Sequence, residues 1–149
     1  NMLTLRKKYS SRTTNSLHRF YKYKNIIKDL EVNRPNQVWV SDITYIQMSK
    51  GFCYLIAIMD LFSRKILTWK LSNTLDKRFC IETLNEALDH YPKPEIFNTD
   101  QGSQFTSTEF TSILKSNDIQ NSKNKILFAF NIFSDILKIE VQSSKIATK

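Results

Sequence analysis

Two aspartates in this sequence stand where packing alone does not explain a carboxylate. Asp42 lies in a segment whose side chains alternate, so it is expected to share one sheet face with Val40 and Thr44. Aspartate is depleted from strands, and a carboxylate on an apolar face is costly unless it is protonated or paired with a cation. A divalent metal ion shared with a second carboxylate would supply that cation.

The second carboxylate belongs to Asp100, which closely follows the apolar pair Ile96 and Phe97. In open α/β sheets, ligands bind beyond the carboxyl ends of the strands, and Asp100 would stand at such an end. An aspartate beside Gly102 is also common in a plain turn. The backbone N–H groups of residues 101–103 could serve that turn or approach a phosphate group.

The elements that must position these carboxylates are three strands, a helix, a strand and a second helix. Each is read from its periodicity and from the turn residues that flank it. A capping-box spacing from Thr106 to Glu109 indicates where the second helix begins. The expected ranges are 37–47, 52–59 and 66–71 for the strands, 76–90 for the helix, 96–97 for the fourth strand, and a helix after 106–109 that carries Phe110, Ile113 and Leu114.

This order of elements predicts an α/β fold with a mixed sheet and helices packed against it. The second strand is apolar on both faces, which is typical of the middle of a covered sheet. A helix between the third and fourth strands predicts a parallel pairing for the fourth. Asp60 ends the second strand beside Ser63 and Arg64, and we interpret it as a turn residue rather than a catalytic acid.

Positive charge is concentrated at the start of the chain. Residues 1–34 hold nine Lys or Arg residues against two acidic ones, a net charge of +7 (9 − 2). The net charge of all 149 residues is +8, so almost all of it lies in this segment. Aromatic residues are interleaved with these charges, a pattern typical of contact with nucleic-acid phosphates and bases, while a solvated leader is the alternative. The residues predicted to bind nucleic acid are Arg6, Lys7, Lys8, Arg12, Arg19, Lys22 and Lys24.

The remaining composition excludes several classes of protein. Only two cysteines are present, Cys53 and Cys80, both within apolar patterns, so a disulfide framework is not expected and a reducing cytoplasm fits best. No apolar run reaches the length of a membrane span, and no signal peptide is recognisable, so no membrane partner is expected. His18 and His90 have no companions at zinc-ligand spacing.

Three segments, in this order, closely resemble the catalytic core of bacterial insertion-sequence transposases. They are residues 34–46 around Asp42, residues 58–66, and residues 99–107 around Asp100. The resemblance covers roughly residues 9–120 and is to the integrase-type DDE group, which also includes retroviral integrases. The basic arm resembles that family's linker between a helix-turn-helix DNA-binding region and the core.

The resemblance implies an RNase H-like fold and DNA transposition by metal-dependent strand cleavage and transfer. In that family two aspartates and a glutamate hold two Mg²⁺ (or Mn²⁺) ions. Asp42 matches the first aspartate and Asp100 the second, so both are expected to be catalytic metal ligands. The implied partners are double-stranded DNA, as element ends and as target, and a second copy or an intact transposase. The implied location is the bacterial cytoplasm, at the nucleoid.

The sequence departs from the family where the third acid should be. That position falls near Ile136, with Asp135 one residue before it and Glu140 four beyond. A shift of one residue turns a helical side chain by about 100°, so neither acid is expected to take the place of the glutamate, although both remain alternatives. We therefore expect a core that is incomplete at its C-terminal end and catalytically defective.

These expectations divide the chain into three parts. Residues 1–34 form the basic linker arm, residues 35–120 a partial integrase-type core, and residues 121–149 a divergent tail that a reading-frame change or truncation would explain. The family's helix-turn-helix is also missing from the start, so segments are expected to be lost at both ends. Two other functions stay open: a non-enzymatic DNA-binding remnant, and an RNase H-like nuclease with a substitute acid from the tail.

Overall fold

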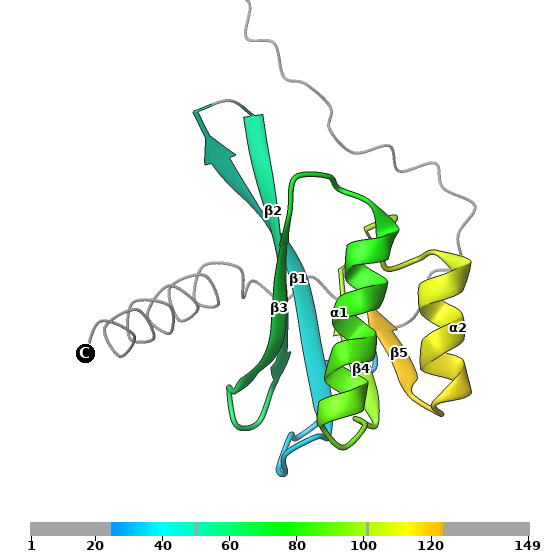
Figure 1. Cartoon of the computed structure of the whole chain (residues 1–149). Coiled ribbons are helices and arrows are strands. Elements are labelled where there is room, and N and C mark those ends of the chain that lie inside the picture. Colours follow the sequence, from blue (N-terminus) through cyan, green and yellow to red (C-terminus); the bar gives the residue numbers. More distant parts are fainter. Residues whose placement is uncertain (1–24, 50, 101, 124–149) are drawn as a thin grey trace, which may run out of the picture.

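The computed structural model describes residues 25–49, 51–100 and 102–123. Five strands and two helices make up this part of the chain (Figure 1). In chain order they are β1 Val38–Met48, β2 Gly51–Asp60, β3 Ile66–Ser72, α1 Lys77–His90, β4 Ile96–Thr99, α2 Thr108–Ser116 and β5 Gln120–Lys123.

The strands form one mixed sheet in the order β3-β2-β1-β4-β5. β2 pairs antiparallel with both β1 and β3, whereas β4 pairs parallel with β1 and with β5. The predicted α/β class, the central position of the apolar strand beside β1 and the parallel pairing of β4 are all confirmed. β1 and β4 therefore run in the same direction, and β4 ends at Thr99 while β1 continues to Met48.

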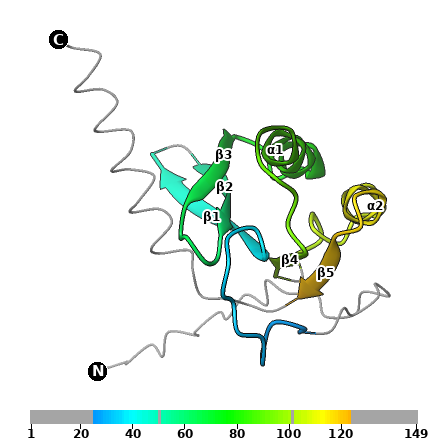
Figure 2. The same cartoon turned by 90° about the horizontal axis from the view of Figure 1, so that it is seen from below.

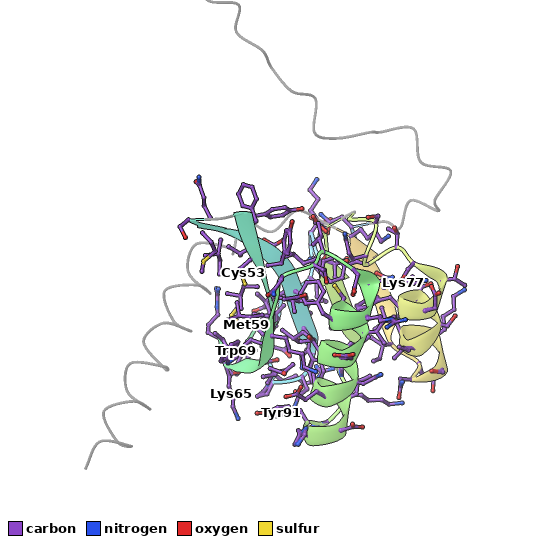
Figure 3. All side chains as sticks on the ribbon, turned by 45° about the horizontal axis from the view of Figure 1, so that its top comes forward. Cys53, Met59, Lys65, Trp69, Lys77 and Tyr91 are labelled. Carbon is purple, nitrogen blue, oxygen red and sulfur yellow. The ribbon has the colours of Figure 1, made fainter. Side chains whose placement is uncertain are left out.

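Both helices cover one face of this sheet (Figure 2). The core beneath them contains Trp39, Phe97 and Phe110, all almost fully buried, with the Phe97 and Phe110 rings 5.8 Å apart in an edge-on arrangement. The start of β3 is joined to the end of α1 by the Lys65 ammonium, which lies 4.8 Å from the centre of the Tyr91 ring (Figure 3). Helix α1 is therefore fixed against the sheet at its C-terminal end as well as through its apolar face.

The opposite face carries a second apolar cluster. Val38, Val40 and Met59 belong to it, and the segment before β1 runs along this side of the sheet (Figure 2). Ile27, Leu30 and Val32 of that segment pack against the cluster. Packing therefore begins ahead of Pro35, where the sequence had indicated the start of the core, because apolar residues at the end of the basic arm have sheet surface to cover.

Two local features differ from the sequence prediction. β5 was not predicted, because Gln120–Lys123 is a polar segment without the apolar alternation of a half-buried strand; it forms against the free edge of β4. The cap of α2 is Ser107 instead of Thr106: its hydroxyl accepts a hydrogen bond from the Phe110 N–H at 3.3 Å. Glu109, the expected reciprocal partner, forms an ion pair with Lys77 of α1.

The described residues contain no helix that is both long and apolar enough to cross a membrane. Within the same residues both cysteines are free thiols, with Cys80 buried and Cys53 half-buried.

Candidate metal centre

Asp42 lies in β1, and Asp100 directly follows β4, the strand that pairs in parallel with β1. In this parallel pair Val38 lies opposite Ile96 and Val40 opposite Asn98. Continued by two residues, past the end of β4, the same register would bring Asp100 level with Asp42 along the strands. Neighbouring strands are about 4.8 Å apart, so adjacent carboxylates in one row can share a cation. The strand that precedes Asp100 is thus the neighbour of the strand that contains Asp42.

Each of these carboxylates is half-buried and held by a backbone N–H. The Ile43 N–H donates to Asp42 Oδ1 at 2.9 Å, and the Gly102 N–H donates to Asp100 Oδ1 at 2.9 Å. The turn interpretation of Gly102 is correct in this respect, since its N–H serves Asp100 and so is not directed at a phosphate. A Cβ atom at residue 102 would lie 3.0 Å from Asp100 Oδ1, so the absence of a side chain allows this close approach.

The charge of Asp100 contributes to the pKa shifts of groups on three different elements. Burial raises the pKa of the Tyr45 hydroxyl on β1, with smaller contributions from Tyr54 and Asp100. Burial also raises the pKa of the Cys80 thiol on α1 to about 12, assisted by Asp76 and then Asp100. On β5, burial lowers the pKa of Lys123, and Asp100 opposes that shift. Asp100 therefore contributes to the pKa of groups on β1, α1 and β5.

Lys123 is the residue of this region that the sequence did not single out. It is paired with Thr99, the residue before Asp100, and it is only 4% exposed. The sequence had assigned it to the divergent tail, and nothing in the polar segment around it marks a buried strand. Its place depends on the pairing of β5 with β4, which is a long-range feature.

Asp60, the last residue of β2, pairs with Trp39 at the start of β1 and holds a turn together. It is 2% exposed, and its Oδ1 accepts a hydrogen bond from the Asn36 N–H at 2.8 Å. Its Oδ2 accepts from both the N–H (2.9 Å) and the hydroxyl (2.6 Å) of Ser63. The turn role predicted for Asp60 is confirmed by these contacts.

The donors at the carboxyl edge suit a hard divalent cation, although they form only part of a site. Carboxylate oxygens are preferred ligands of Mg²⁺ and Mn²⁺, and Asp42 and Asp100 would supply one carboxylate each. Among residues 25–49, 51–100 and 102–123, no three His, Cys, Asp or Glu side chains gather closely enough to hold a metal ion. The two acids offered as third ligands, Asp135 and Glu140, lie outside the described residues, as do the seven basic residues from Arg6 to Lys24.

Known transposases are similar to this chain in sequence. The transposase for insertion sequence element IS904 of Lactococcus lactis subsp. lactis (strain IL1403) is 36% identical over 104 residues, which are 68% of this chain and 41% of that protein. Transposase InsF for insertion sequence IS3A of Escherichia coli (strain K12) is 32% identical over 97 residues, 64% of this chain and 34% of that protein. The chain thus spans about two fifths or less of the length of these relatives.

A solved structure agrees in fold. The catalytic core domain of HTLV-2 integrase in complex with magnesium, in its dimeric form, superposes with a TM-score of 0.60 at 25% identity, covering 73% of each chain. This likeness supports the RNase H-like architecture. The integrase core domain family itself matches residues 32–125, well over half of the 149 residues. The chain therefore belongs to the integrase core domain family.

Proposed function

We propose that this chain is a partial catalytic core of an insertion-sequence transposase, acting in DNA transposition through a metal site that Asp42 and Asp100 form. The observation that carries the proposal is the parallel register of β1 and β4, whose continuation by two residues would bring Asp100 level with Asp42. Two adjacent negative charges repel each other, so a shared divalent cation stabilises both in their ionised form.

The roles of the two carboxylates follow from their supports. Asp42 is carried by the long strand β1, which is paired on both sides, and Asp100 by the turn that Gly102 closes. Both therefore present oxygen atoms from fixed backbone, as a metal ligand requires. Bound Mg²⁺ or Mn²⁺ would supply Lewis acidity for attack by water or a DNA 3′-hydroxyl on a phosphodiester.

Double-stranded DNA is the proposed partner, and the basic arm is its proposed contact. Arg6, Lys7, Lys8, Arg12, Arg19, Lys22 and Lys24 supply the charge for phosphate binding. The IS904 and InsF relatives are transposases, and the HTLV-2 integrase core forms dimers in its solved structure. We extend both properties to this chain: DNA as element ends and target, and pairing with a second copy or an intact transposase, in the bacterial cytoplasm.

Defective catalysis is part of the same proposal. The third acid of the family falls near Ile136, so two ligands instead of three would hold the metal. Two carboxylates can still bind a divalent cation, though more weakly, and leave it poorly positioned for strand transfer. Asp135 and Glu140 are the acids that could compensate.

The test is a Mn²⁺-supported cleavage and strand-transfer assay on a labelled duplex, with calorimetric titration of Mn²⁺ into the same protein. Asp42→Asn and Asp100→Asn are the matched variants, because each removes one negative charge and keeps the shape of the side chain. We expect Mn²⁺ binding that either substitution weakens at least tenfold, and little or no strand transfer. Binding that survives both substitutions would refute the site. Strand transfer lost in both variants and in Asp135→Asn would mean that the tail supplies a working ligand.

A second candidate function is a DNA-binding protein without enzymatic activity. The observation that favours it is the apolar residue Ile136 at the position of the third acid, together with the strongly basic arm. Such a protein would bind duplex DNA without Mn²⁺, and its affinity would fall steeply with salt. Affinity that does not change between about 50 and about 200 mM salt would exclude phosphate contact by the arm.

A further inference from the structure

The hairpin of β1 and β2 carries aromatic rings that are exposed to solvent. Among the described residues six large apolar side chains are exposed, and three of them lie in this hairpin: Tyr45 at 59%, Met48 at 56% and Phe52 at 54%. The hairpin extends past β3, whose last residue Ser72 pairs with Tyr54, and past both helices (Figure 1). Exposed apolar side chains that gather at one place are typical of a contact with a partner.

The aromatic side chains of the hairpin share the helix-covered face of the sheet. Tyr45 lies opposite Tyr54, and Tyr54 packs against the core beneath the helices. Residues two apart in a strand point to the same face, which adds Phe52. The Tyr45 and Tyr54 rings are 5.2 Å apart at an interplanar angle of 80°, so the half-buried Tyr54 supports the exposed Tyr45 ring edge-on. We call Tyr45, Phe52 and Tyr54 the aromatic surface.

Charge along the hairpin favours an anionic partner. Between Asp42 and Asp60 the sequence contains no acidic residue, and Lys50 is the single charged residue of that stretch. Phosphate groups can therefore approach the aromatic surface without repulsion from the hairpin. A second copy of the chain would bring the same positive charge to the contact, which disfavours self-association there. Exposed rings combined with basic charge are typical of single-stranded nucleic-acid binding, in which the rings stack on bases and the charges hold the backbone.

The aromatic surface lies within reach of DNA bound at the two carboxylates. Tyr45 is three residues beyond Asp42 in β1, which corresponds to about 10 Å along the strand. Stacked bases rise by about 3.4 Å, so this distance spans about three nucleotides. The Asp42 and Tyr45 side chains point to opposite faces of the sheet. Because β1 continues to Met48 while β4 ends at Thr99, a nucleic-acid strand that passes the end of β4 can meet both.

We propose that Tyr45 and Phe52 stack on unpaired DNA bases, with Tyr54 as the support of the Tyr45 ring. The class of partner rests on the proposed function, in which DNA is the substrate, whereas the stacking itself requires no metal. A base inside a duplex is already covered by its neighbours, so the rings bind single-stranded segments in preference to intact duplex.

The experiment measures fluorescence anisotropy of a short labelled oligothymidine and of a labelled blunt duplex with the full chain in EDTA. Tyr45→Leu and Phe52→Leu remove an exposed ring and keep an apolar side chain, while Tyr45→Phe keeps the ring. Phe62→Leu is the matched control, because Phe62 is 47% exposed and follows β2 at its other end. We expect Tyr45→Leu and Phe52→Leu each to weaken oligothymidine binding at least about fivefold and to leave duplex binding unchanged. Tyr45→Phe and Phe62→Leu should bind both DNAs like the unaltered chain.

Two results of this experiment would overturn the stacking. One is an oligothymidine affinity that is equal in all five proteins, and the other is an equal loss for both DNAs. Analytical ultracentrifugation of the same proteins tests a second copy as the occupant: a dimer that Tyr45→Leu dissociates, with oligothymidine affinity unchanged, would also overturn it. If the unaltered chain binds neither DNA, the proposed DNA partner and the stacking fail together. If duplex binding persists while the leucine variants change nothing, the stacking alone fails.

Discussion

Two regions along β1 differ in how they use aspartate: the start of the strand, where Asp60 of β2 pairs with Trp39, and the stretch that contains Asp42 and lies near Asp100. At the start of β1, Asp60 is buried and accepts hydrogen bonds from the Asn36 N–H and from the N–H and hydroxyl of Ser63. Further along the same strand lies the half-buried Asp42, and the half-buried Asp100 directly follows β4, which pairs with β1. Asp60 accepts from three donors and is buried, whereas Asp42, which accepts from the Ile43 N–H, and Asp100, which accepts from the Gly102 N–H, are only half-buried. Burial and the number of hydrogen-bond donors around a carboxylate therefore separate a structural aspartate from a candidate metal ligand.

The substitution Asp60→Ala should give the largest effect and is the strongest challenge to this comparison. It removes a buried carboxylate and leaves three donors without their acceptor, so we expect the free energy of unfolding to fall by about 3 kcal/mol. Asp100→Asn removes one of two repelling charges and should change the same quantity by less than about 1 kcal/mol. Urea unfolding at neutral pH in EDTA measures both. Equal losses in the two variants would abolish the distinction between the two regions.

The thiol of Cys80 tests whether burial and the nearby carboxylates Asp76 and Asp100 raise the pKa of a core residue. Its pKa is raised from 9.0 to about 12 by burial, then Asp76, then Asp100. Between these values the unfolded chain releases the thiol proton while the folded chain retains it, so the free energy of unfolding falls as pH rises. The slope from one such group is at most about 1.4 kcal/mol per pH unit. We expect Cys80→Ala to lose this contribution in urea unfolding from about pH 9 to about pH 11, and identical slopes in the two proteins would contradict the assignment.

The comparison also explains which parts of the structure the sequence could predict. Asp42 and Asp100 were recognisable because each interrupts a local pattern, and the helix between the third and fourth strands predicted the parallel pairing of β4. The turn role of Asp60 was predictable from its neighbour Ser63. Lys123 was not, because its burial comes from the pairing of a polar four-residue strand with β4, and no local periodicity encodes that contact.

The cap of α2 and the start of packing show the same limit. Ser107 and Thr106 are both good capping residues, and only the path of the preceding loop selects Ser107. Ile27 and Leu30 lie in a strongly basic segment, which suggested an arm separate from the core, yet their side chains cover the sheet face opposite the helices. Charge along the sequence suggested a partner for the arm but could not locate the boundary of the fold.

Replacement of Gly102 tests whether the position of the Asp100 carboxylate matters for metal binding. A Cβ there would approach Asp100 Oδ1 to 3.0 Å, so Gly102→Ala should displace the carboxylate and cost about 1 kcal/mol in unfolding free energy. Gly51→Ala is the matched control: its φ of 109° strains an alanine, at a comparable cost, but nothing lies within 4 Å of the added Cβ. We expect calorimetry to find weaker Mn²⁺ binding in Gly102→Ala only. A similar loss of binding in both would attribute it to general destabilisation.

The smallest effect should come from an ion pair at the same end of the sheet as Asp60. Arg34 and Glu95 are 2.6 Å apart, but each side chain is 54% exposed, so water solvates both charges when the pair is broken. Arg34→Ala should therefore lower the free energy of unfolding by only about 0.5 kcal/mol, and less in about 0.5 M salt. Urea unfolding at two salt concentrations measures the difference. A loss as large as that of Asp60→Ala would mean that charge pairing holds this end together. The expected small loss would instead assign its stability to the hydrogen bonds of the buried Asp60, whereas Asp42 and Asp100 are only half-buried.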